Sequence, residues 1–196
     1  MATYRSPHIQ VVAEAPRTPL VPNGVMGMLI FVFTELMLFG GFLSAFIIIR
    51  SGAVAWPPPG QPALPFEQTA FNTALLLLSG VMLFVTRRRF DRDRASARTP
   101  MWIAMGLAAA FVVLQGREWV ALLSQGLTLT SSSLGSFFFM VIGLHAIHVV
   151  VALGMLARSH WRLRRGWLAS SQLGATEVFW YFVVGVWPVV WLVMYQ

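Results

Sequence analysis

The residues of this sequence that could take part in proton transfer or metal binding are a few acidic and histidine side chains. They lie inside long apolar segments. Glu35 lies near the middle of the first such segment, flanked by Phe33 and Leu36. A charged carboxylate at that depth in a bilayer costs at least about 2.5 kcal/mol to insert, so it must be neutral, paired or in contact with a wet cavity. Glu35 therefore has two interpretations: a neutral acid that hydrogen-bonds to a neighbouring helix, or a proton-linked site.

His145 and His148 lie three residues apart in the fourth apolar segment, which places both on one face of a helix. Imidazoles at this spacing can bind a metal ion or haem. However, two neighbours on one helix cannot ligate opposite sides of a haem, and the chain has no cysteine or carboxylate cluster to complete a metal shell. We therefore expect structural or lipid-contacting histidines, and no catalytic residue, metal site or cofactor in this chain.

Four further residues are candidates for contacts with lipid or between helices. Glu118, near the end of the third apolar segment, can reach headgroups or another helix, and Asn72 in the second is an interhelical donor. Glu177 lies in the predicted first turn of the fifth helix, where the helix dipole favours an acid, or it pairs with arginines of a neighbouring loop. Trp56 suits the headgroup level of a membrane.

Five apolar segments must position these side chains, and each is long enough for the roughly 20 helical residues that cross a bilayer. Hydrophobic residues make up 57% of the 196 residues and charged residues only 11%, which is more apolar surface than a soluble fold could bury. We predict an all-α, polytopic membrane protein, with an N-terminal leader over 1–23 and one five-helix transmembrane domain over 24–196. The predicted helices lie near 24–49, 67–86, 101–123, 134–157 and 173–195.

The arginines predict how this bundle is oriented. Twelve of the 14 lie in the leader and in the loops after the second and fourth helices, whereas Arg50 and Arg117 lie toward the other side. Positive loops stay in the cytoplasm, so the N-terminus is predicted to be cytoplasmic and the C-terminus periplasmic. The net charge of +7 is thus confined to loops and does not form a basic face, and we expect no nucleic-acid partner.

Sequence motifs in successive segments resemble one known family. The motifs are TELMLFGGFLSAF from Thr34, WPPPG from Trp56, FNTALLLLSG from Phe71, LQGREW from Leu114 and GSFFFMVIGLHAIHVVVALGML from Gly135. Any one of them is weak, but together and in this order they resemble subunit III of cytochrome c oxidases and related quinol oxidases, in a short five-helix form.

The fifth predicted helix departs from the family pattern, which usually reads Trp-His-Phe-x-Asp-x-x-Trp. This chain has WYFVVGVW from Trp180, with Tyr181 in place of the histidine and Val184 in place of the aspartate. Pro188 follows and is expected to kink the helix. The altered helix keeps a second reading open, the corresponding small subunit of a nitric oxide reductase.

The resemblance implies a non-catalytic subunit of a proton-translocating haem-copper terminal oxidase, which reduces oxygen to water in aerobic respiration. Haem and copper would lie in partner subunits I and II, in a bacterial cytoplasmic (inner) membrane. This subunit would stabilise subunit I, hold membrane phospholipids and support proton uptake, with Glu35 as the carboxyl of the lipid cleft. A proton-coupled transporter using Glu35 is a further alternative, but the sequence has no inverted repeat or pair of broken helices.

Overall fold

The computed structural model describes residues 21–62 and 64–195, and within them the chain folds into five α-helices and no strands. All five helices are long and apolar enough to cross a membrane, which confirms the predicted fold class of a multi-pass membrane protein. Almost all of the predicted leader over 1–23 lies outside the described residues, and the orientation in the membrane stays a prediction. The helices are α1 (Asn23–Ser51), α2 (Phe66–Phe90), α3 (Arg98–Ser124), α4 (Ser133–Arg164) and α5 (Ser170–Tyr195).

Several helices extend beyond the apolar segments that predicted them. Helix α2 continues through its arginines to Phe90, α4 continues to Arg164, and α5 begins at Ser170. Arginine has a high helix propensity, and cations are favourable in the last turn of a helix. The arginine-rich stretch after 157 is therefore almost entirely helical and the one after 86 is helical to Phe90, where the sequence predicted loops. The reason is that hydropathy marks the membrane crossing and not the end of the helix.

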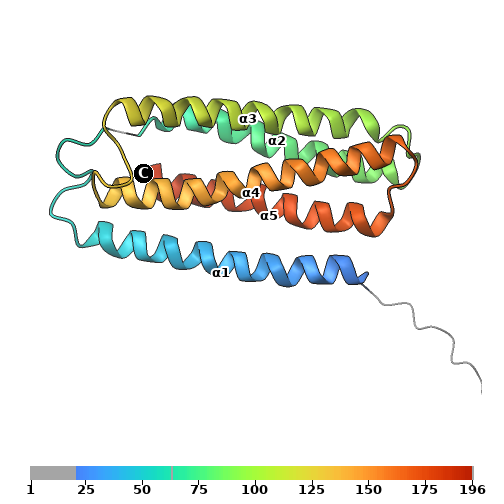
Figure 1. Cartoon of the computed structure of the whole chain (residues 1–196), viewed down its shortest axis with the longest axis horizontal. Helices are drawn as coiled ribbons and strands as arrows, with labels where there is room; N and C mark the ends of the chain where they lie inside the picture. The colour runs from blue at the N-terminus through green and yellow to red at the C-terminus, as the bar shows by residue number, and fades with distance from the viewer. Residues whose placement is uncertain (1–20, 63, 196) are drawn as a thin grey trace, which may run out of the picture.

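Helix α5 occupies the centre of the bundle and α1 lies at its edge (Figure 1). Helix α5 packs against α1, α2 and α4, and α3 packs against α2 and α4. Helix α1 contacts only α4 and α5 among the helices. In the most apolar part of α1 only 17% of residues are buried, against 56% in α5. Much of the apolar surface of α1 is therefore left for lipid or for another protein.

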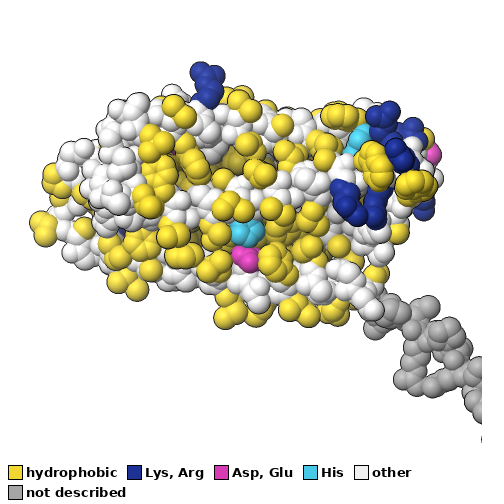
Figure 2. Space-filling model, in the orientation of Figure 1, with side chains coloured by type: hydrophobic (Ala, Val, Ile, Leu, Met, Phe, Trp, Pro, Cys, Tyr) yellow, Lys and Arg dark blue, Asp and Glu magenta, His cyan; other side chains and the backbone are white. Residues whose placement is uncertain are grey.

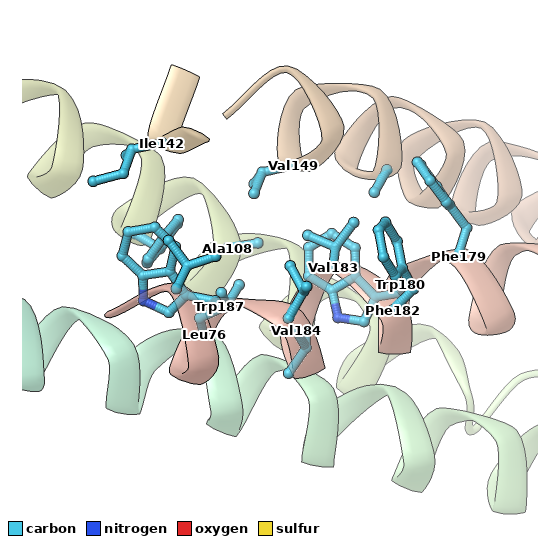
Figure 3. Close-up of a cluster of buried hydrophobic side chains, with 14 of the residues drawn as sticks. Leu76, Ala108, Ile142, Val149, Phe179, Trp180, Phe182, Val183, Val184 and Trp187 are labelled. Carbon is cyan, nitrogen blue, oxygen red and sulfur yellow. The ribbon is translucent and has the colours of Figure 1, made fainter. Parts of the chain in front are cut away.

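Two tryptophans of α5 form the middle of the buried core (Figure 3). Trp180 and Trp187 are fully buried, and the Trp187 indole N–H donates to Thr73 Oγ1 on α2 at 2.9 Å. Val184 lies between them against Gly80, where an added Cβ would approach Val184 Cγ1 to 3.2 Å. Val184, which stands where the family usually has an aspartate, thus makes a tight contact between α5 and α2. Helix α5 runs through Pro188 without ending.

The connection from α3 to α4 depends on a glycine. Ser132 caps α4, because its hydroxyl accepts from the Gly135 backbone N–H at 3.1 Å. A Cβ on Gly135 would lie 2.1 Å from the Thr128 carbonyl oxygen and 2.9 Å from Ser131 Oγ. Only glycine lets the loop backbone approach the first turn of α4 this closely. This loop fixes the end of the bundle where α2 begins and α5 ends.

Candidate functional site

Glu35 of α1 and His148 of α4 form a pair between these two neighbouring helices. His148 Nε2 lies 3.1 Å from Glu35 Oε2, and His148 Nδ1 lies 2.7 Å from the Leu144 carbonyl oxygen. A carbonyl can only accept, so Nδ1 must carry a hydrogen. The remaining bond then holds a single proton: either neutral Glu35 donates it to Nε2, or the imidazolium donates it to the carboxylate. Both forms of the pair have zero net charge.

A net-neutral pair explains how these groups tolerate the membrane interior. On the face shown in Figure 2, an acidic and a histidine side chain lie together about halfway along the bundle, in a surface of hydrophobic side chains. A lone carboxylate there would be costly, whereas a paired group shares one proton and exposes no net charge to lipid. The arrangement can move a proton between Glu35 and His148 without any change in charge.

An apolar groove lies directly beside the pair. It has a volume of about 340 Å³ and is formed by α1, α4 and α5. The His148 ring also contacts three phenylalanine rings, with centroids 5.5 to 6.0 Å apart. Apart from His148, the groove is lined by apolar side chains, which suits a hydrocarbon chain. The lining residues are Met28, Phe31, Ile147, His148, Val151, Met155 and Phe179.

His145 has different surroundings from His148, although it is three residues away. It is 1% exposed and stacks on Trp187, with ring centroids 4.7 Å apart. Neither ring nitrogen of His145 has a hydrogen-bond partner in the described residues. The ring lines an interior cavity of about 150 Å³ between α3, α4 and α5. Over residues 21–62 and 64–195, no group of three or more His, Cys, Asp or Glu side chains could hold a metal ion.

A second polar cluster joins three helices at the end of the bundle where α2 begins. Glu118 of α3 accepts a short hydrogen bond from the Tyr195 hydroxyl of α5, and its other oxygen lies 2.9 Å from Thr69 Oγ1 of α2. Gln115 donates to the Tyr195 hydroxyl at 3.4 Å and accepts from Asn72 Nδ2 at 2.9 Å. Glu118 and Asn72 thus make interhelical contacts. Sequence reasoning missed Thr69, Gln115 and Tyr195 as their partners.

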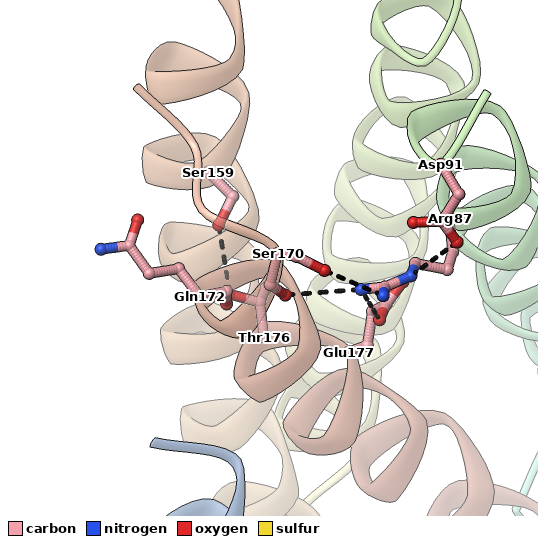
Figure 4. A network of polar contacts seen from close by, with 7 residues as sticks. All are labelled: Arg87, Asp91, Ser159, Ser170, Gln172, Thr176 and Glu177. Atoms are coloured by element: carbon pink, nitrogen blue, oxygen red, sulfur yellow. Dashed lines mark hydrogen bonds and ion pairs between the residues drawn. The ribbon is translucent and has the colours of Figure 1, made fainter. Parts of the chain in front are cut away.

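A third cluster lies at the opposite end of the bundle (Figure 4). Because α5 begins at Ser170, Glu177 is not in its first turn, and that prediction was wrong. Glu177 Oε2 instead lies 3.5 Å from Arg87 Nη1 of α2, which is the arginine pairing that the sequence left as the alternative. Arg87 also contacts Asp91 at 3.2 Å and the Ser170 hydroxyl at 3.0 Å. The cluster ties the end of α2 to the start of α5.

Trp56 and Tyr181 belong to none of these clusters. Trp56 lies in the connection between α1 and α2 and packs the edge of its ring on Phe46, with centroids 5.5 Å apart. The peptide bond between Trp56 and Pro57 is cis. Tyr181, which resembles the family's histidine position, is 40% exposed on the surface of α5. Neither residue extends the Glu35–His148 pair.

The fold and these clusters define a class: a multi-pass helical membrane protein with a one-proton acid–histidine pair beside an apolar groove. The family described as cytochrome c oxidase subunit III matches residues 8–196. The chain belongs to this family, which confirms the resemblance found in the sequence motifs.

Curated relatives agree with the family match. The chain is 27% identical over 176 residues to cytochrome c oxidase subunit 3 of Thermostichus vulcanus, covering 87% of this chain and 86% of that protein. It is 31% identical over 193 residues to the subunit of Tragelaphus imberbis and 30% identical over 193 residues to that of Bos taurus. Both of these matches cover 93% of this chain and 71% of the relative.

Proposed function

We propose that this chain is the non-catalytic subunit III of a proton-translocating haem-copper terminal oxidase in a bacterial cytoplasmic membrane. The observation that carries the proposal is the family match over residues 8–196. Haem and copper would belong to partner subunits I and II, and this chain would contact subunit I. The large apolar surface of α1, which packs only on α4 and α5 among the helices, supports a role in contacts with lipid or with a partner.

The Glu35–His148 pair is the part of this chain that we assign to lipid binding and proton uptake. The groove beside it, with a volume of about 340 Å³, is apolar enough to hold an acyl chain against the His148 ring. A bound lipid would exclude water from the pair and hold α1 against α4. The shared proton can shift between the two side chains without creating net charge. Uptake of a further proton would give the pair a charge of +1, and release of the shared proton would give it a charge of −1, so either step requires water or a counter-charge beside the pair.

Purification of the intact complex tests the proposal. With an affinity tag on this chain and a mild detergent, two larger subunits should co-purify, and the reduced-minus-oxidised spectrum should show haem. The complex should consume oxygen. Consumption of nitric oxide in place of oxygen would favour the reductase alternative. Recovery of the chain without any haem-containing partner would contradict both readings.

A further inference from the structure

A polar pocket separate from the Glu35 groove opens between α2 and α3. It has a volume of about 580 Å³, and its polar lining comes from Gln68, Asn72, Arg117 and Glu118. It lies near the start of α2 and the end of α3. Most basic side chains on the face in Figure 2 gather at one end of the bundle. Arg117 lies near the end of α3, which is opposite the end where the arginine-rich parts of α2 and α4 lie.

Arg117 is the unbalanced charge of this pocket. Its side chain is exposed, and within the part of the chain that the structure describes it has no hydrogen bond, ion pair or ring contact. The neighbouring acid makes no ion pair with it, and both oxygens of Glu118 are engaged by Tyr195 and Thr69. An exposed guanidinium in a membrane protein requires an anion or water around it.

The contacts of Thr69 are satisfied with Glu118 in either protonation state. The Thr69 hydroxyl lies 2.8 Å from the Pro65 carbonyl oxygen and 2.9 Å from Glu118 Oε2, and the same carbonyl also accepts from the Thr69 backbone N–H at 3.2 Å. The hydroxyl can therefore donate to a Glu118 carboxylate, or donate to the carbonyl and accept from a protonated Glu118. When Glu118 is protonated, the pocket holds the positive charge of Arg117 with no opposing carboxylate.

The position of Arg117 along α3 places it near the membrane surface. It lies seven residues before the end of α3 at Ser124, about 10 Å along the helix axis at 1.5 Å per residue. Arginine side chains at such a depth extend their guanidinium toward the headgroup layer. The phosphate groups of that layer are tetrahedral, and their two unesterified oxygens can accept two parallel hydrogen bonds from the planar arginine fork.

Asn72 supplies a second and independent polar group. It is 2% exposed, and its Oδ1 has no partner in the described residues. Its orientation follows from the network: Tyr195 donates to Glu118, so Gln115 turns its Nε2 to Tyr195 and its Oε1 to Asn72 Nδ2. Asn72 lines the pocket, and its Oδ1 is an unsatisfied acceptor with less than 1 Å² of accessible surface, so a ligand donor reaches it only when the pocket wall shifts slightly.

We propose that the α2–α3 pocket binds the headgroup of a glycerophospholipid. The Arg117 guanidinium binds the phosphate oxygens, and Asn72 Oδ1 accepts a hydrogen bond from a hydroxyl or ammonium group of the same headgroup. Phe71 and Leu114 in the lining contact the first part of the acyl chains. The site rests on the proposed membrane role, but lipid retention is measured on the purified protein whatever subunits accompany it, so the two proposals can fail separately.

Lipid analysis of charge variants tests the site. The complex of wild type, R117A, R117K or R92A is washed in delipidating detergent, and the retained lipid is measured by phosphorus content and by mass spectrometry. Arg92 is the matched control, because it is an exposed arginine in the loop between α2 and α3 at the other end of the bundle. Loss of a charge-assisted phosphate contact should lower lipid affinity in R117A by about tenfold or more. R117K keeps a cation and R92A keeps the site, so both should retain the lipid.

Further measurements distinguish a lipid headgroup from other anions that could bind Arg117. Exchange into lipid nanodiscs should restore the bound lipid with phosphatidylethanolamine or phosphatidylglycerol, whose headgroups carry donors, and not with phosphatidylcholine. Equal lipid retention in wild type and R117A would overturn the proposal. So would a ligand with the mass of inorganic phosphate, or an R117A complex that loses a partner subunit while its lipid content is unchanged, because the anion would then be free phosphate or an acidic partner side chain.

Discussion

Glu35 and Glu118 are the same residue type in apolar helices, but the structure uses them differently. Glu35 has one side-chain partner, His148, and sits at the edge of the bundle beside a groove. Glu118 has a partner for each oxygen, Tyr195 and Thr69, which come from two other helices. The difference is that Glu118 connects α2, α3 and α5, whereas Glu35 makes a single hydrogen bond between α1 and α4.

The comparison shows that depth in the membrane does not by itself separate a functional acid from a structural one. What separates them is the set of groups that are left unsatisfied when the acid is removed. Without Glu118, two hydroxyl groups among packed helices lose a partner. Without Glu35, only one nitrogen of His148 loses a partner, and this ring borders a groove that can admit water or lipid. A one-partner acid at an open edge is therefore the acid that we propose for proton exchange.

The largest effect is expected for E118A. This change removes the acceptor of the Tyr195 hydroxyl and one of the two partners of the Thr69 hydroxyl, which keeps the Pro65 carbonyl. A buried donor without an acceptor costs about 1–3 kcal/mol and a lost hydrogen bond about 1 kcal/mol, so the free energy of unfolding should fall by about 2–4 kcal/mol. E118Q is the matched control: its amide oxygen still accepts from Tyr195 and its amide nitrogen donates to Thr69, so it should cost less than about 1 kcal/mol. Thermal unfolding in detergent measures both. Equal stability of E118A and wild type would show that Glu118 is not a structural acid.

A smaller stability effect is expected at Glu35, with the larger effect on proton-linked activity. E35A should lower the free energy of unfolding by about 1 kcal/mol, since one hydrogen bond at the bundle edge is lost. E35Q should assemble normally, because its amide can donate to His148 Nε2. The amide cannot release a proton, however, so proton uptake per oxygen reduced should fall in the assembled complex. Normal proton uptake in E35Q would show that Glu35 is only a packing contact.

The number and place of the membrane helices could be predicted from the sequence, because each crossing is a long apolar run. The helix ends could not, since α4 continues through Arg158 and Arg162 to Arg164, beyond the apolar segment. The central place of α5 was also not predictable. Hydropathy alone does not distinguish a helix surrounded by helices, such as α5, from one that faces lipid, such as α1.

The candidate residues were predictable singly but not as pairs. Glu35 and His148 each stood out as polar groups in apolar segments, yet they are 113 residues apart and no local pattern links them. Tyr195 gave no signal, because a tyrosine near the end of an apolar segment is usual at a membrane interface. His145 and His148 share a helix face by spacing, but α5 covers His145 while His148 borders the groove.

The smallest effect is expected at the third acid, Glu177, whose partner is partly in water. Arg87 is 33% exposed and lies 3.5 Å from Glu177, so R87A should lower the free energy of unfolding by about 0.5–1 kcal/mol. R89A is the control, because Arg89 is an exposed neighbour of equal charge. Unfolding at low salt and at about 1 M salt should show a difference between the variants that shrinks as screening increases. If R87A costs as much as E118A at both salt concentrations, the number of buried partners does not set the ranking of these acids.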